Sequence, residues 1–145
     1  MTDRKKWMSV LAKAPWPALE ALWRDRPGKP HFSVLRAPET GLVMVRTRAG
    51  GSGNPFNMGE ATVTRCAVVS VTGHTGHAYI LGRNHLHARA AAEIDALLQD
   101  DTVRDALMEE VIAPLAGQAS DRAQQERAKT AATKVDFFTM VRGED

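Results

Sequence analysis

The stretch from residue 60 to residue 82 reads EATVTRCAVVSVTGHTGHAYILG, and it decides the fold class. Its first half, which ends at Val71, is rich in β-branched residues that favour strands. Thr72 and Gly73 are typical turn residues, and the apolar segment at residues 76–82 follows them. The pattern predicts two antiparallel strands joined by a short turn.

Two further strands are predicted upstream of this hairpin. They read FSVLR at residues 32–36 and LVMVRTR at residues 42–48, and turn residues at positions 38–41 separate them. Residues 31–83 therefore form a meander of antiparallel strands.

Helical patterns lie on both sides of the strands. Residues 1–26 are expected to form two helices, and residues 84–133 form further helices, the first capped by Asn84. The chain closes with VDFFTMV, which predicts a fifth strand at residues 134–142. Strands followed by helices predict one α+β domain over residues 1–145. We expect an antiparallel sheet of about five strands with helices packed on one face, preceded by an N-terminal helical pair.

Single residues set the expected boundaries of the later helices. Thr102 is expected to cap the second of them, and Pro114 is expected to end it. A third helix, from Ser120 to about Thr133, contains almost no large apolar residue, so it cannot bury much surface on its own.

A glycine-rich loop joins two of the strands. Glycine permits positive φ and a close approach of the backbone, and consecutive exposed N–H groups can bind an anion such as phosphate. Because side chains alternate along a strand, Arg46 and Arg48 point the same way at the mouth of this loop. The candidate anion-binding residues are Arg46, Arg48, Gly50, Gly51, Gly53, Asn54, Asn57 and Glu60.

The same loop has a simpler interpretation. A run of glycine, serine, asparagine and proline between strands is often only a long connection, and this one does not open a helix as phosphate-binding loops do. The two arginines can equally be solvated, and Glu60 can be an ion-pair partner of Arg46 or Arg48.

No metal site and no catalytic set is predicted. His85 and His87 are two residues apart on a helix, so their rings diverge, and only His77 merits a test for chemistry. Cys66 is the single cysteine and is expected to be a small buried residue of a strand. We therefore expect no metal and no cofactor bound by this chain alone.

The charge balance is nearly even, with 19 basic and 17 acidic residues. Any basic patch must be local, and the alternative function is a small nucleic-acid-binding module that uses arginines. Arg65 shares a strand face with apolar neighbours and needs a partner. No segment approaches the roughly 20 apolar residues of a membrane span, so we expect a cytoplasmic protein. The arginines of this alternative are Arg46, Arg48, Arg65 and Arg83.

Several aromatic residues allow two interpretations. They line a partner interface, in which aromatic residues are enriched, or they are simply core. The residues are Trp7, Trp16, Trp23, Phe137 and Phe138.

Five blocks of the chain together resemble the PhnG family, a subunit of the bacterial carbon-phosphorus lyase core complex. The resemblance covers nearly the whole chain, and blocks of this length in this order are more specific than any short motif. The blocks are RKKWMSVLAKA (4–14), LRAPETGLVMVRTRAGGSGNPFNMGEATVTRC (35–66), GHAYILGRN (76–84), AAEIDALLQD (91–100) and AATKVDFFTMVRGE (131–144).

The resemblance implies a role in the use of phosphonates as a phosphorus source. Members of the family act with partner subunits, chiefly the nucleosidase-like PhnI, with PhnH and PhnJ. In that reaction an alkylphosphonate displaces adenine from MgATP and leaves a ribose 1-phosphonate 5-triphosphate. MgATP is then a substrate of the assembled complex, and the isolated chain is expected to be inactive.

Overall fold

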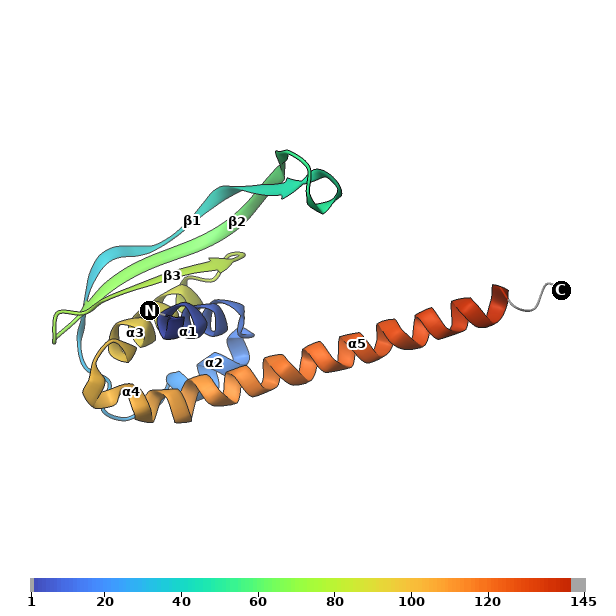
Figure 1. Cartoon of the computed structure of the whole chain (residues 1–145). Helices are drawn as coiled ribbons and strands as arrows, with labels where there is room; N and C mark the ends of the chain where they lie inside the picture. Colours follow the sequence, from blue (N-terminus) through green and yellow to red (C-terminus); the bar gives the residue numbers. More distant parts are fainter. Residues whose placement is uncertain (1, 142–145) are drawn as a thin grey trace.

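The computed structural model describes residues 2–141 and contains a three-stranded antiparallel sheet (Figure 1). The strands are β1 (Phe32–Arg48), β2 (Pro55–Ser70) and β3 (Thr75–Leu81), paired in the order β1-β2-β3. Both neighbouring pairs of strands are antiparallel, as predicted. Helices cover one face of the sheet, and this arrangement confirms the α+β class. The expected count of about five strands is wrong for this part of the chain.

Two helices precede the sheet, as predicted, and a longer helical region follows it. Pro15 lies at the N-cap of the second helix, and Pro17 lies in its first turn. The helices are α1 (Thr2–Lys13), α2 (Trp16–Trp23), α3 (His85–Leu98), α4 (Asp101–Leu107) and α5 (Ala113–Val141), with a 3-10 turn η1 (Ala49–Gly51) and a π-helical turn η2 (Met108–Ile112).

β1 is one strand of 17 residues, so the turn predicted at residues 38–41 is wrong. Its register against β2 shifts between Val34 and Arg36 and again between Arg36 and Glu39. Each shift leaves an extra residue on β1, which makes it a bulge. Bulges and edge positions are where a strand tolerates proline, so Pro38 bends β1 without ending it.

The strand predicted at residues 134–142 is also wrong, because residues 134–141 continue α5, and residue 142 lies outside the described residues. The β-prone residues there follow a run rich in alanine and other good helix formers. Extending an existing helix adds one hydrogen bond per residue, whereas a strand needs a neighbouring strand to bond to.

Pro114 does not end a helix. It lies one residue inside α5, directly after the π-helical turn η2, in which the Ala113 N–H bonds to the Met108 carbonyl. Proline lacks an N–H and its ring crowds the preceding turn, and the wider π turn relieves both problems. The chain therefore stays helical from η2 into α5.

The helix caps differ in how well they were predicted. Asn84 caps α3, where its Oδ1 accepts the His87 N–H at 2.9 Å, as expected. The cap of α4 is Asp100 rather than Thr102, because the Asp100 carboxylate accepts the Thr102 N–H at 2.9 Å. A carboxylate two residues earlier reaches the free N–H groups that a threonine inside the helix cannot cap.

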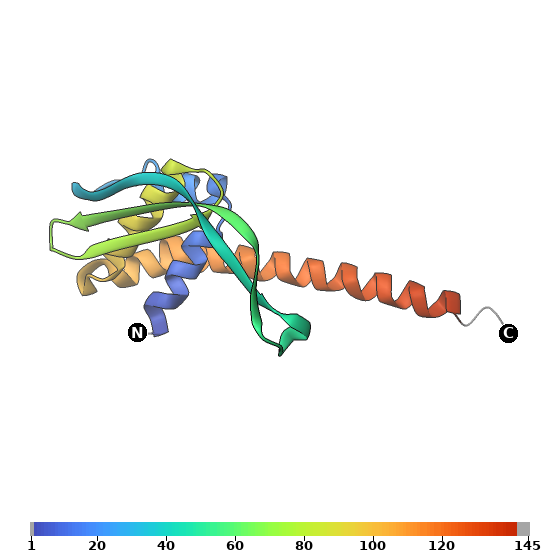
Figure 2. The same ribbon diagram turned by 90° about the horizontal axis from the view of Figure 1, so that it is seen from above.

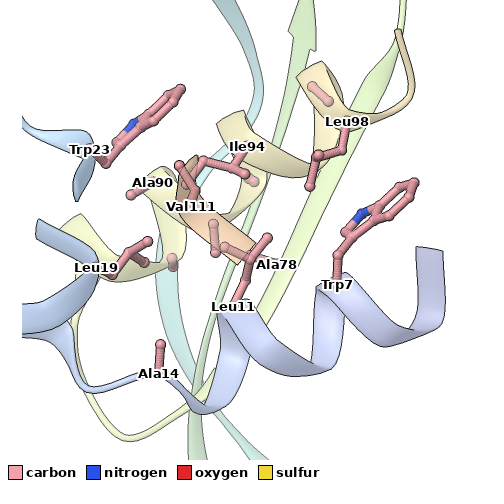
Figure 3. Packing of buried hydrophobic residues seen from close by; sticks show 14 of the residues in the cluster. Trp7, Leu11, Ala14, Leu19, Trp23, Ala78, Ala90, Ile94, Leu98 and Val111 are labelled. Carbon is pink, nitrogen blue, oxygen red and sulfur yellow. The ribbon is translucent and has the colours of Figure 1, made fainter. Parts of the chain in front are cut away.

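α3 contacts all three strands, and Figure 3 shows its residues Ala90, Ile94 and Leu98 within the packed core. Its buried face is largely alanine, which lets helix and sheet approach closely. Gly76 of β3 lies at the closest point, because a Cβ atom there would lie 1.9 Å from the Ala92 carbonyl oxygen. The sheet face that carries these contacts is called the inner face below, and the opposite face is called the outer face.

Asp95 of α3 is fully buried and joins three elements. Its carboxylate accepts hydrogen bonds from Arg4 at 2.8 and 3.2 Å, from the Trp7 indole at 2.8 Å and from the His77 N–H at 2.9 Å. α1 is thereby fixed to both α3 and β3. Sequence patterns did not single out this residue.

The tryptophans belong to the core. Trp7 and Trp23 are buried, and Trp16 stacks on the His87 ring with the ring centroids 5.8 Å apart. The interface interpretation is therefore wrong for Trp7 and Trp23, which are core residues, and it stays a prediction for Trp16, which is only partly buried. Phe137 and Phe138 lie in α5, and their side chains are outside what the structure describes.

Two elements project from this core (Figures 1 and 2). The distal half of the β1–β2 hairpin extends beyond the end of β3, and α5 runs outward so that its far end lies well away from the sheet. Residues 117–133 of α5 are all exposed, as their polar sequence predicts. Among the helices of residues 2–141, none is both long and apolar enough to cross a membrane.

Candidate functional site

The candidate residues from the sequence all lie on one projecting element. We call residues 41–62 the arm, which is the part of the β1–β2 hairpin that lies beyond the paired end of β3, at Leu81 and Val63. The arm is a twisted two-stranded ribbon with a turn at its tip (Figure 2). The structure therefore brings the arginines, glycines and asparagines of the loop together.

Arg46 and Arg48 share one face of the arm, as predicted. In register with β2, Arg46 lies opposite Asn57, and Arg48 lies opposite Pro55. A register shift at this point leaves Met58 as an extra residue on β2, so β1 itself keeps its alternation. Glu60 lies opposite Met44 on the same face, which continues the inner face of the sheet beyond the helices.

The turn at the tip depends on its glycines in two different ways. Gly50 and Gly51 have φ values of 61° and 81°, which residues with a side chain rarely adopt. Gly53 does not have positive φ, but a Cβ atom there would lie 2.6 Å from the Ala49 carbonyl oxygen. The Gly53 N–H donates to that oxygen at 2.8 Å, which closes the turn tightly. Gly53 is therefore required for space rather than for its φ.

The charged groups of the arm are exposed and available to a ligand. Within the described chain, Arg46, Arg48 and Glu60 form no ion pair, so the expected pairing of Glu60 with an arginine is not found. Arg48 makes one weak contact, from Nη1 to the Gly53 carbonyl oxygen at 3.4 Å. A planar guanidinium left without a carboxylate partner can bind the paired oxygens of a phosphate or phosphonate.

The arm also exposes large apolar side chains. Leu42 is 64% exposed and Met44 is 56% exposed, and both share the face of the two arginines. Phe56 is 48% exposed on the opposite face, across from Thr47. A ribbon that is apolar on both faces is typical of a segment that another chain covers. Alternation along the strand puts Leu42 and Met44 on the face of the arginines, but only the fold reveals that both side chains stay exposed.

Arg65 finds the partner that its sequence context requires. It lies on the outer face, where its Nε donates to Glu39 at 2.6 Å, and Arg36 donates to the same oxygen at 2.6 Å. The hydrogen bond from Arg36, followed by that from Arg65, lowers the pKa of Glu39. A hydrogen bond with Tyr79, followed by that with Glu39, raises the pKa of Arg65.

The arginines proposed for nucleic-acid binding do not form one patch. Arg65 is ion-paired on the outer face, whereas Arg46 and Arg48 lie on the other face of the ribbon. Arg83 lies in the bend after β3, and among residues 2–141 no hydrogen bond or ion pair joins it to the others. These four arginines of the described chain therefore form no continuous basic surface for a nucleic acid to follow.

The structure also places the histidines and the cysteine that the sequence offered for chemistry. His87 is buried, and its Nε2 lies 2.8 Å from the Leu11 carbonyl oxygen. His85 bonds to Thr40, and His77 is exposed on the outer face of β3. Cys66 is buried in β2, as predicted, and burial raises the pKa of its thiol. Within residues 2–141, no group of three or more potential metal ligands is found.

A family model described as "Phosphonate metabolism protein PhnG" matches residues 2–143. The chain therefore belongs to the PhnG family of phosphonate metabolism proteins. It is 49% identical over 148 aligned residues to a protein of Rhizobium meliloti (strain 1021), and the match covers all of this chain and 92% of that relative. That relative is named "Alpha-D-ribose 1-methylphosphonate 5-triphosphate synthase subunit PhnG". The resemblance identified from the sequence blocks is confirmed.

Proposed function

We propose that this chain is a non-autonomous subunit of an enzyme complex that transfers an alkylphosphonate to the ribose C1 of MgATP with release of adenine. The observation that carries the proposal is the end-to-end relationship to a protein named as a subunit of the corresponding synthase. The exposed apolar residues of the arm support a role as a subunit that a partner chain covers. An isolated two-stranded ribbon is only marginally stable in water.

In this proposal the arm meets a polyanion at a subunit junction. Arg46 and Arg48 bind oxygens of the triphosphate or the phosphonate, and the backbone of Gly50, Gly51, Gly53 and Asn54 lies close to them. Asn57, opposite Arg46, and Glu60, opposite Met44 on the same face, orient the guanidinium groups. Displacement at a ribose carbon needs leaving-group activation and charge stabilisation rather than a nucleophile in the protein, and the arginines supply the second of these.

The partners in this proposal are the other carbon-phosphorus lyase core subunits, chiefly the nucleosidase-like PhnI, with PhnH and PhnJ, in the cytoplasm. This chain holds no cofactor by itself, and MgATP is a substrate of the assembled complex. The catalytic groups then lie outside this chain, and the chain contributes charge and position.

The test is adenine release from MgATP and methylphosphonate. The isolated chain, the partner subunits without it, and the reconstituted complex are assayed side by side. Adenine release by the complete complex, and by neither part alone, is expected. Turnover by the isolated chain would refute the non-autonomous role, and full turnover by the partners without it would refute the role as a required subunit.

A further inference from the structure

β3 has one open edge, and its odd-numbered residues turn their backbone groups toward that edge. β2 lies on one side of β3, and among residues 2–141 no strand lies on the other. The Gly82 N–H donates to the Thr62 carbonyl oxygen at 2.8 Å, and the Ser70 N–H donates to the His74 carbonyl oxygen at 2.9 Å. Opposite residues in an antiparallel ladder alternate between bonded and non-bonded pairs, so the even-numbered residues of β3 bond to β2. The N–H and C=O groups of the odd-numbered residues therefore point away from β2.

The two halves of this open edge differ. At the start of β3, side chains from the helical layer already bond the Thr75 carbonyl oxygen and the His77 N–H. In the second half, no partner within the described chain is found for the N–H and C=O groups of Tyr79 and Leu81. Their side chains are 56% and 79% exposed. This half of the edge is open to another extended strand.

β3 also lacks the features that protect the other open edge of the sheet. β1 carries Pro38 and two bulges, which hinder pairing with a further strand. The register of β3 against β2 has no shift, and residues 75–81 contain no proline. β3 is therefore a regular strand with an unprotected end.

An apolar pocket lies beside the open half of this edge. It lies between α1 and β3 and has a volume of about 240 Å³. In Figure 2, which shows the molecule from above, α1 extends past β3 on the side away from β2. α1 thus provides a floor on which a further strand can rest. The apolar side chains that line the pocket are those of Met8, Leu11, Ala12, Ala78 and Ala91.

We propose that an extended segment of a partner subunit pairs with residues 77–81 and adds a fourth strand to the sheet. The segment bonds to the free backbone groups of Tyr79 and Leu81. Because side chains alternate along a strand, the residue opposite Ala78 turns an apolar side chain into the pocket, and its neighbour lies beside Tyr79 on the outer face. Backbone bonds supply affinity in this mode of binding, and the pocket supplies specificity. The inference rests on the proposed function only for the source of the segment.

β3 of a second copy does not fit this edge. Directly opposite residues of paired strands point to the same face, so pairing of two β3 strands would place the helices of both copies on one side of the joined sheet. β3 contacts its own α1 and α3 on that side. The α1 helices of the two copies would then compete for the same space beneath the joined strands. The occupant is therefore a strand that has no helix of its own beneath it at this point.

Hydrogen exchange tests the pairing. The isolated chain is compared with the complex reconstituted with PhnI, PhnH and PhnJ. The amides of Tyr79 and Leu81 are expected to exchange about tenfold or more slowly in the complex. The amides of Ala78 and Ile80, which bond to β2, are the internal control and are expected to exchange slowly in both states. Unchanged exchange at Tyr79 and Leu81 in an assembled complex would overturn the proposal.

Tyr79→Pro removes one donor of the open edge and leaves the bonds to β2 intact, since proline is tolerated where the N–H faces away from the sheet. Its affinity for the partner subunits is expected to fall by about tenfold or more. Tyr79→Ala also removes the ring but keeps the N–H, so it is the matched control and is expected to bind within about threefold of the parent. Circular dichroism checks the fold of both variants. Equal affinity of a folded Tyr79→Pro chain and its control would overturn the backbone pairing.

The pocket is tested separately from the edge. Ala12→Phe fills the space beside Ala78 and is expected to weaken partner binding, whereas Ala12→Ser leaves the space open and is expected to bind as the parent does. Equal binding by the two variants would overturn the role of the pocket. Adenine release is measured on the same complexes. Slowed exchange without adenine release would refute the proposed function and leave the edge pairing, and adenine release with unchanged exchange would do the reverse.

Discussion

Arg4 of α1 and Asp95 of α3 form a two-pronged ion pair, in which the Arg4 Nε and Nη2 donate to the two carboxylate oxygens at 3.2 and 2.8 Å. The carboxylate also accepts the Trp7 indole N–H, and the Asp95 side chain is fully buried. A buried charge is tolerated when every oxygen is bonded, and here the arrangement fixes α1 on the core.

Asp95→Ala is expected to lower the free energy of unfolding by about 3 to 5 kcal/mol, because it leaves the Arg4 guanidinium and the Trp7 N–H without their acceptor. Urea unfolding followed by tryptophan fluorescence measures the change. Glu20→Ala breaks an exposed pair with Arg24 and serves as control, with an expected loss of about 0.5 kcal/mol or less. Equal losses in both variants would contradict this assignment.

Gly76→Ala is expected to destabilise the fold by about 3 kcal/mol or more, because the new methyl group would overlap the Ala92 carbonyl oxygen and force α3 from the sheet. Gly41→Ala is the matched control in β1, since it has open space around its Cβ position and no positive φ. That change is expected to alter stability by no more than about 0.5 kcal/mol. Thermal unfolding of the two variants decides the matter, and a Gly76→Ala protein as stable as the parent would show that α3 packs less closely.

Glu39 provides a pH-dependent contact. Its pKa is lowered from the ordinary 4.5, chiefly by Arg36 and then by Arg65. A carboxylate with a depressed pKa contributes stability above its unfolded-state pKa, and that contribution is lost as the pH falls through the folded-state value. NMR titration of the Glu39 carboxyl should give a midpoint below 4.5, which Arg36→Ala raises more than Arg65→Ala. An unchanged midpoint in both variants would show that the two ion pairs do not form in solution.

Arg48→Lys keeps the charge but loses the fork of the guanidinium. In the assembled complex we expect adenine release to fall by roughly tenfold to a hundredfold, the equivalent of one charge-assisted contact of about 1.5 to 3 kcal/mol. Gly53→Val should also impair the complex, since its side chain would meet the Ala49 carbonyl oxygen. Assembly is checked in parallel by gel filtration. Full activity in both variants would show that the loop only connects two strands. Failed assembly would show that the loop binds a partner subunit instead.

The sequence predicted those elements whose signals are local. The β-branched run around Cys66, the Asn84 cap and the two arginines on one strand face depend on neighbours within a few residues, and the structure bears them out. The misplaced elements depended on context. Residues 134–141 have strand-forming side chains but follow a helix that is already formed, and Pro38 falls on an edge where a bulge absorbs it.

The candidate residues could be named from the sequence, but the surface on which they lie could not, and their role in binding stays a prediction. Alternation placed Arg46 beside Leu42 and Met44, yet whether helices cover that face depends on where α3 begins relative to the arm. Two partners of Asp95, Arg4 and Trp7, lie 91 and 88 positions away in the chain, so no local pattern could reveal these contacts.

The exposure of α5 has a consequence for the resistance of the chain to proteolysis in the cell. At about 1.5 Å per residue, its 29 residues extend about 43 Å, and over residues 117–133 no side chain of its own chain shields them. Helices held only by local bonds fray, so the peptide bonds after Arg122, Arg127 and Lys129 are open to trypsin-like proteases in the unassembled chain. A partner lying along this helix would close those bonds to cleavage. Survival of the C-terminal segment then reports assembly, and copies made in excess of their partners are the ones that proteolysis removes.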